Sequence, residues 1–179
     1  MNLKNLILSL VILFSSQNIT IIYPFAAELY IKTPLMIVTQ KQNLISIQTL
    51  INAGADVNAI YGWDQPHCGK SVLACAIDTH SIDAVKLLLE AGACVETPAD
   101  IPEKYFHISK ALGLRAFPLI SYAIIVNAPI EIIELLIQHS KNLNATGPFD
   151  KNQKYTCYEI AQYCQNTQAM RLLNHTVEL

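Results

Sequence analysis

The chain has 179 residues, of which 52% are hydrophobic and 15% are charged, and its net charge is −2 with the histidines neutral. The apolar content excludes a disordered chain, and the charge balance offers no basic patch for nucleic acid or for an acidic membrane surface. The length allows one compact domain or one short repeat array.

The N-terminal segment has the pattern of a secretory signal. Lys4 precedes an apolar run from Leu6 to Phe14, which Ser15 and Ser16 interrupt. Nine helical residues rise about 14 Å, well short of a hydrocarbon core of roughly 30 Å. We therefore expect residues 1–27 to be a signal peptide and the protein to be exported, either secreted or periplasmic.

Two alternatives remain open for this segment. Residues 19–27 form a second apolar patch, interrupted by Thr20 and Pro24. Joined to the first run, it would give an uncleaved membrane anchor, and only then would the protein have a membrane as a partner. The other alternative is a buried N-terminal helix.

The rest of the chain contains an internal repeat. The sequence Gly-Ala-Asp-Val-Asn at positions 54–58 recurs as Gly-Ala-Cys-Val-Glu at positions 92–96. We call the separation between the two copies, from position 54 to position 92, the repeat offset. At the same offset, Thr-Pro-Leu at positions 33–35 aligns with Ser-Val-Leu at positions 71–73. Before each glycine, aliphatic residues recur at helical spacing, and glycine is the usual residue at a left-handed helix end.

Two looser copies follow. The third opens at residues 117–119 (Phe-Pro-Leu), continues in an aliphatic helix at residues 132–137 and carries two extra residues near 127–129. Ser140 stands at its glycine position, which predicts a weaker helix end. The fourth copy begins at Thr156 and runs to Leu173.

These landmarks resemble the ankyrin repeat, whose signature opens with T-P-L-H and ends with G-A-x-V-N. The resemblance covers about four degenerate repeats between Lys32 and Leu173, and it implies an all-α solenoid of antiparallel helix pairs with hairpin loops. We place this domain at residues 28–179, with repeats at about 32–60, 70–97, 116–145 and 155–179. The signature His is missing from every copy, where the sequence comparison aligns Met36, Ala74, Ile120 and Glu159.

The repeats are longer than the usual ankyrin unit of about 33 residues. Equivalent positions in successive copies, namely Leu35, Leu73, Leu119 and Tyr158, are all further apart than that unit length. The excess falls mostly between the helix pairs, at residues 59–70 and 97–116. We expect the insertions to lie on one side of the stack, and the second to contain a short extra helix around residues 103–112.

The resemblance implies a non-catalytic module that binds another protein through its concave face and loop tips. The aromatic and polar side chains of the first insertion are candidate contacts, because aromatic anchors in loops are frequent binding hot spots. Exposed positions at the ends of the first helices would join them. The candidates are Tyr61, Trp63, Asp64, Gln65, His67, Thr39, Gln40, Asp78 and Thr79.

Two other interpretations compete with this one. Trp63 could instead pack back onto its own repeat as a loop anchor. The repeats could also form a structural scaffold, tethered to a membrane or an envelope by the N-terminal segment.

Neither catalysis nor a cofactor is indicated. The chain has no nucleophile elbow, no phosphate-binding glycine loop and no zinc-protease motif. Five cysteines occur, but His67, Cys68 and Cys75 lack the spacing of zinc ligands. Cys157 and Cys164 are separated by about 10 Å of helix rise, which is too far for a direct disulfide. We expect no metal site, and the sequence assigns no disulfide.

Overall fold

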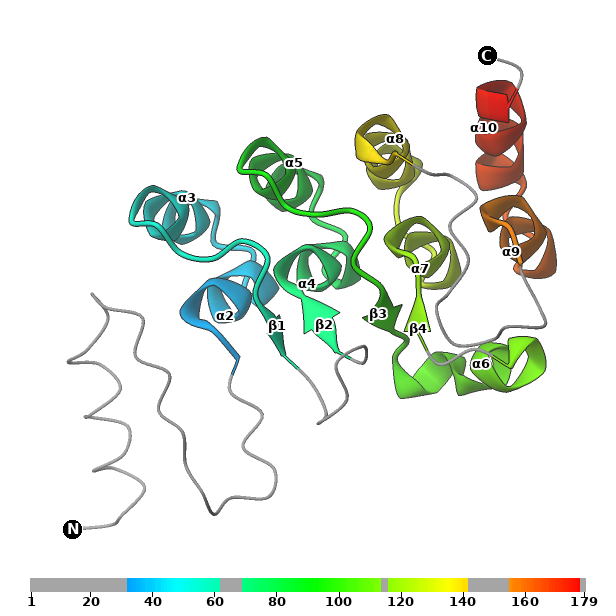
Figure 1. Ribbon diagram of the computed structural model, residues 1–179, viewed down its shortest axis with the longest axis horizontal. Helices are drawn as coiled ribbons and strands as arrows, with labels where there is room; N and C mark the ends of the chain where they lie inside the picture. Colours follow the sequence, from blue (N-terminus) through cyan, green and yellow to red (C-terminus); the bar gives the residue numbers. More distant parts are fainter. Residues whose placement is uncertain (1–31, 62–68, 114–115, 142–154, 178–179) are drawn as a thin grey trace, which may run out of the picture.

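The computed structural model describes residues 32–61, 69–113, 116–141 and 155–177 (Figure 1). Four pairs of antiparallel helices follow one another along the chain, joined by short strands and one added helix. The pairs are α2 (Pro34–Gln40) with α3 (Leu44–Asn52), α4 (Val72–Asp78) with α5 (Ile82–Glu90), α7 (Leu119–Ile125) with α8 (Ile130–His139), and α9 (Cys157–Tyr163) with α10 (Thr167–Val177).

The helices form two parallel rows (Figure 1). One row contains the first helix of each pair and the other contains the second, and we call these the inner and outer helices. Each inner helix packs against the next, from α2 through α4 and α7 to α9, and the outer helices do the same. The aliphatic runs therefore form successive layers, which confirms the predicted stack of helix pairs.

Small residues let the inner helices approach one another. Ala74, Ala76, Ala123 and Ala161 are all completely buried. The outer helices supply larger side chains, and Leu88 and Leu136 are likewise buried. Each pair is thus buried both within itself and against its neighbours, so its core continues into the next repeat.

Hydroxyl caps start three of the inner helices. The side chains of Thr33, Ser71 and Thr156 each accept a hydrogen bond from the backbone N–H three residues later. At Thr156 the Glu159 carboxylate also accepts from the Thr156 backbone N–H at 2.7 Å, which completes a capping box. These caps satisfy N–H groups that have no partner within the helix.

The first helix of the third repeat begins one residue later than the alignment of the four internal copies placed it. Pro118 has an extended backbone and precedes the helix as its N-cap, so Ile120 corresponds to Leu73. The position of the missing signature His is consequently Ser121, and the assignment to Ile120 was wrong. Only one residue, Pro129, is then inserted between this turn and the outer helix, where two were expected.

The turn within each pair has a fixed form. Gln42, His80, Asn127 and Gln165 occupy equivalent positions and have φ values of 54°, 55°, 55° and 56°. The residue after each donates its backbone N–H to a carbonyl of the inner helix, as in the 2.9 Å bond from Ala128 to Ala123. The left-handed residue reverses the chain in a turn of three to four residues.

Glycine ends the first two outer helices, and its absence changes the third. Gly54 and Gly92 have φ values of 83° and 88°, which residues with a β-carbon rarely adopt. At the equivalent position Ser140 takes φ −83° and ψ 141°, so the chain leaves α8 extended. The weaker helix end predicted for Ser140 is therefore an exit without the left-handed turn.

Side chains at the repeat ends join neighbouring repeats. Asn58 Oδ1 accepts the Cys94 backbone N–H at 2.7 Å, and Asn58 Nδ2 donates to the Gly92 carbonyl at 3.2 Å. One repeat later, Glu96 Oε1 accepts from both the hydroxyl of Ser140 and the backbone N–H of Lys141 at 2.9 Å. Asn58 and Glu96 occupy equivalent positions in repeats 1 and 2. Each therefore forms hydrogen bonds to residues at the end of the outer helix in the next repeat.

Short strands correct the all-α prediction. β1 (Ile60–Tyr61) pairs with β2 (Lys70–Ser71), and β3 (Ala99–Asp100) pairs with β4 (Ala116–Phe117), both antiparallel. The backbone N–H of Asp100 donates to the Gly69 carbonyl at 3.2 Å, which links the two hairpins. The strands form because the long insertions return the chain to a common edge of the stack.

The first two insertions each lie between the two strands of a hairpin. The second contains the 3-10 turn η1 (Glu103–Tyr105) and helix α6 (Phe106–Leu112), which confirms the extra helix predicted there. Helix α6 lies below α7 and α9 in Figure 1. Most of the first insertion, at residues 62–68, lies outside the described residues, as do residues 142–154 between the third and fourth repeats.

None of the helices in the described ranges is long and apolar enough to cross a membrane. The predicted signal or anchor at residues 1–27 lies outside those ranges and stays a prediction.

Replacing Asn58 with alanine tests the link between the first two repeats. Two hydrogen bonds across the repeat boundary would be lost, so the free energy of unfolding in urea should fall by about 1 kcal/mol. Asn52→Ala is the matched control, since Asn52 accepts only a bond from Gln48 within its own helix. That pair is worth about 0.2–0.5 kcal/mol, and equal losses for both variants would contradict the bridging role.

Candidate functional site

The inner helices and the strands border one side of the stack, which we call the hairpin face (Figure 1). On repeats 1 and 2 it is defined by Lys32, Gln40, Tyr61, Lys70 and Asp78, and the buried Tyr122 of repeat 3 contacts it from the next inner helix. These side chains come from strands and from inner helices, and they connect to one another across the repeat boundaries.

In repeat 1 the polar side chains meet at the start and end of α2. Lys32 Nζ donates to Gln40 Oε1 at 2.8 Å, and the same ammonium lies 5.3 Å from the ring centre of Tyr61. A cation at this distance from an aromatic ring is attracted to it. The bond and the ring contact hold Tyr61 beside the inner helix.

Repeat 2 has the same arrangement with a full ion pair. Lys70 Nζ pairs with the Asp78 carboxylate, and Tyr122 of the next repeat donates its hydroxyl proton to that carboxylate. Lys70 also lies 5.6 Å from the ring centre of Tyr122. The side chains of Lys70 and Asp78 are 20% and 25% exposed, so the pair is partly screened from solvent.

The two polar groups follow one sequence rule. Lys32 and Gln40 have the same spacing as Lys70 and Asp78, and each member recurs at the repeat offset. Gln40 Nε2 donates to the Cys75 sulfur at 3.8 Å, which connects the groups. A polar pair on the hairpin face is therefore a repeated feature of the first two repeats.

In repeat 3 the same pair is apolar and covered. The equivalent positions are Phe117 and Ile125, which are 0% and 3% exposed. Residues of η1 and α6 lie over this part of the stack, where Tyr105 donates to the Val126 carbonyl at 3.3 Å and Ile108 is buried. Among the described residues, the hairpin face is consequently partly exposed in repeats 1 and 2 and covered by the second insertion in repeat 3.

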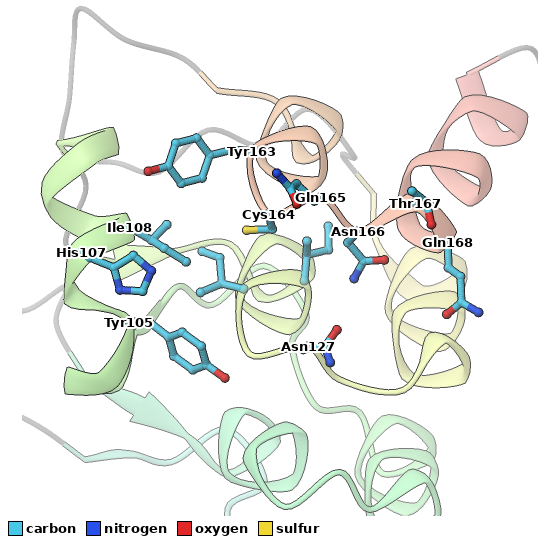
Figure 2. A pocket seen from close by; sticks show the side chains of 12 residues that line it. Tyr105, His107, Ile108, Asn127, Tyr163, Cys164, Gln165, Asn166, Thr167 and Gln168 are labelled. Carbon is cyan, nitrogen blue, oxygen red and sulfur yellow. The ribbon is translucent and has the colours of Figure 1, made fainter.

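A cleft of about 570 Å³ remains between the insertion and the inner helices (Figure 2). Tyr105 and His107 approach it from η1 and α6, whereas Tyr163 and Cys164 belong to the end of α9. The remaining side chains are amides, a hydroxyl and aliphatics, namely those of Ile108, Ile124, Ile125, Asn127, Gln165, Asn166, Thr167 and Gln168. Such a lining can form hydrogen bonds and apolar contacts, and it has no acidic residue.

The thiols of the inner helices are held in their neutral form. Burial raises the pKa of Cys75 above its ordinary value of 9.0, and the negative charge of Asp78 raises it further. Burial likewise raises the pKa values of Cys157 and Cys164. Because the thiolate is the nucleophile, these side chains act as packing groups at neutral pH.

Among the described residues, no three His, Cys, Asp or Glu side chains are grouped as a metal site would require. His67 and Cys68, which the sequence analysis considered as ligands, lie outside the described ranges. Cys75, Cys94, Cys157 and Cys164 are free thiols in the structure.

The predicted contact residues other than Thr39 separate into three groups. Tyr61, Gln40 and Asp78 lie on the hairpin face. Trp63, Asp64, Gln65 and His67 lie outside the described residues. Thr79 is half-buried in the turn of repeat 2, where its hydroxyl donates to the Ala76 carbonyl at 2.9 Å.

The prediction for Thr39 was wrong. Its side chain is completely buried, and its hydroxyl donates to the Leu35 carbonyl one helical turn earlier at 2.7 Å. The internal bond satisfies the hydroxyl, so threonine fills the core position that Ile77 occupies in the next repeat.

Sequence reasoning missed Lys32, Lys70 and Tyr122. The two lysines were available from the repeat offset, because each stands immediately before a capping hydroxyl and at the same spacing from Gln40 or Asp78. Tyr122 gave no such signal, since its contact with Asp78 depends on how two consecutive repeats are stacked.

The Tyr122 hydroxyl makes a specific alkaline prediction. Burial, the charge of Asp78 and the hydrogen bond to it together raise the pKa of Tyr122 far above its ordinary value of 10.0. The native state thus keeps a proton that the unfolded chain releases above that pH. The contribution of this proton to the free energy of unfolding is complete below pH 10.0 and is lost as the pH rises beyond it.

In Tyr122→Phe the free energy of unfolding should therefore fall less steeply with pH in the alkaline range. Above pH 10.0 the slope of unfolding free energy against pH should be shallower than in the unchanged chain by up to about 1.4 kcal/mol per pH unit, which corresponds to one proton. Urea denaturation at several pH values measures this slope. Identical slopes would show that the phenol is not held protonated by the fold.

Comparisons with known proteins agree with this architecture. Residues 32–61 match the family model for the ankyrin repeat. The chain is also 28% identical over 148 residues to a fowlpox virus (strain NVSL) protein named as a putative ankyrin repeat protein. That similarity covers 82% of the chain but only 38% of the viral protein, so the chain spans well under half of its relative.

Proposed function

We propose that the chain, which belongs to the ankyrin-repeat family, binds a partner protein through the hairpin face of repeats 1 and 2. Ankyrin repeats generally mediate protein–protein interactions and are generally non-catalytic. The finer proposal is where this chain binds, and one observation carries it: among the described residues, the polar pair on the hairpin face is at least partly exposed in repeats 1 and 2, whereas its apolar counterpart in repeat 3 is buried under α6.

The geometry favours recognition by a prearranged surface. Lys32, Lys70 and Asp78 already have partners within the chain, so little side-chain freedom would be lost on binding. Tyr61 is held against the Lys32 ammonium and adjoins Ile60, which is 56% exposed. Tyrosine and tryptophan are enriched among binding hot spots.

The first insertion is joined to this surface at both of its ends. Tyr61 ends β1, and Trp63, Asp64, Gln65 and His67 follow it before β2 returns at Lys70. Because the two strands pair, the residues between them are connected to the hairpin face at both ends. Trp63 is therefore proposed as a second aromatic contact beside Tyr61.

The proposal limits the footprint to the first half of the stack. Helix α6 covers the hairpin face of repeat 3 and contributes Phe106, which is 57% exposed. A partner that used the whole length of the face would have to displace this helix. The footprint we propose ends before it, and a scaffold role with a membrane tether stays an untested alternative.

Affinity capture of partners with the full chain tests the proposal, followed by affinity measurement for each captured protein. Trp63→Ala and Tyr61→Ala should weaken binding by about tenfold or more, as expected when an aromatic anchor is truncated. The matched control is Phe106→Ala, which removes an exposed aromatic side chain outside the proposed footprint and should leave affinity unchanged.

Lys86→Ala is a second control, because Lys86 is exposed on the outer helix α5. If Trp63→Ala and Tyr61→Ala bind like the unchanged chain while Phe106→Ala or Lys86→Ala does not, the partner uses another surface. That result would reject the proposed footprint.

A further inference from the structure

The outer side of repeat 1, which faces away from repeat 2, has the composition of an internal repeat interface. Pro34 and Ile37 of α2 correspond to Val72 and Cys75 of α4, at the repeat offset. In the later repeats the residues at the Ile37 position are Cys75, Tyr122 and Ile160, with exposures of 0%, 0% and 1%. Ile37 is 42% exposed, because no described residues precede repeat 1 to cover it.

Neighbouring positions show the same contrast. Val38 is only half-buried, whereas its counterparts Ala76, Ala123 and Ala161 are completely buried by the preceding repeat. On the outer helix, Leu50 is half-buried, whereas Leu88 and Leu136 are 0% exposed. Repeat 1 thus presents an apolar face made of Pro34, Ile37, Val38 and Leu50, which we call the entry face.

The other end of the described stack is built differently. Exposed side chains on α9 and α10 are mostly polar, including Gln162, Gln165, Gln168 and Arg171. Terminal repeats need a polar outer face when no further element covers them. The C-terminal repeat meets that requirement, and the entry face does not.

We propose that residues 19–31 of this same chain cover the entry face, with residues 28–31 alongside α2, so that residues 19–27 belong to the folded domain and not to the signal peptide expected from the sequence. The segment leads directly into Lys32, which is fixed to Gln40 by its side chain and to the Tyr61 ring. It is predominantly apolar, with aliphatic or aromatic residues at Ile19, Ile21, Ile22, Tyr23, Phe25, Leu29, Tyr30 and Ile31. The occupant is therefore present in the chain at the point where cover is needed.

The length of the segment fits the face. Four extended residues span about 13 Å, whereas the helix between Pro34 and Lys41 rises only about 10 Å. Residues 28–31 can consequently run back along α2 past Ile37. The preceding residues are long enough to continue toward Leu50 on the outer helix.

Photo-crosslinking in the full chain tests this contact directly. A benzophenone amino acid replaces Ile37, and the crosslinked peptides are identified by mass spectrometry. We expect intramolecular crosslinks to residues 19–31. Crosslinks to a second copy of the chain, crosslinks to added lipid vesicles, or no crosslink in the purified chain would each overturn the proposal.

A cycle of substitutions in the full chain adds a thermodynamic test. Ile37→Asp should lower the melting temperature by about 2–4 °C, a typical shift for a modest loss in a chain of this size. The same substitution should have a much smaller effect once Leu29, Tyr30 and Ile31 are all replaced by serine. Additive effects would show that the two regions do not touch.

Ile45→Asp is the matched control for the cycle. Ile45 is 82% exposed at a position where the later repeats carry Asp83, Glu131 and Gln168. It lies on the solvent side of α3, so its replacement should have the same small effect with and without the serine substitutions. Coupling at Ile45 equal to that at Ile37 would show that the segment does not cover the entry face specifically.

Discussion

Burial between neighbouring helix pairs is the interaction on which the rest of the structure depends. Each inner helix has small or aliphatic residues on two sides, and Ala76, Ala123 and Ala161 are completely buried by the preceding pair. One pair alone would leave one of those sides in water, and the lost burial would amount to several side chains at roughly 25 cal/mol per Å². The repeats therefore hold one another in place, and polar bridges such as that of Asn58 fix the alignment.

That constraint also determines where function can lie. Residues that stack against a neighbour cannot vary freely, whereas the side chains at the hairpin edge can. The Lys32–Gln40 and Lys70–Asp78 pairs use this freedom in repeats 1 and 2. Phe117 and Ile125, at the same positions of repeat 3, are buried beneath the insertion. The same two positions of the repeat thus form a polar surface in repeats 1 and 2 and a covered apolar one in repeat 3, depending on which side chains occupy them.

Much of this architecture could be read from the sequence, because its signals are local. Gly54 and Gly92 mark left-handed helix ends, and Thr33, Ser71 and Thr156 mark helix starts. The stacked helix pairs follow from their spacing. The site was harder to predict because it depends on neighbours far along the chain. Thr39 was taken for an exposed polar residue, although its hydroxyl is satisfied within its own helix.

The register of the third repeat was misjudged for a different reason. The comparison matched Pro118 to Pro34, yet Pro118 caps its helix and Pro34 is the first helical residue. Proline suits both positions, so the residue type alone could not separate them. The contact between Tyr122 and Asp78 depends on this register, which is why the sequence did not indicate it.

The boundary between repeats 3 and 4 offers the most direct measurement of the stacking itself. The Ser121 hydroxyl oxygen lies 3.4 Å from the Cys157 sulfur, and both side chains are buried between α7 and α9. In Ser121→Cys, mild oxidation should form one disulfide between position 121 and Cys157, detected by mass spectrometry of the digested protein. The unchanged chain should form none there. If oxidation instead joined position 121 to Cys75, Cys94 or Cys164, the helix pairs would not be stacked in the order and register described.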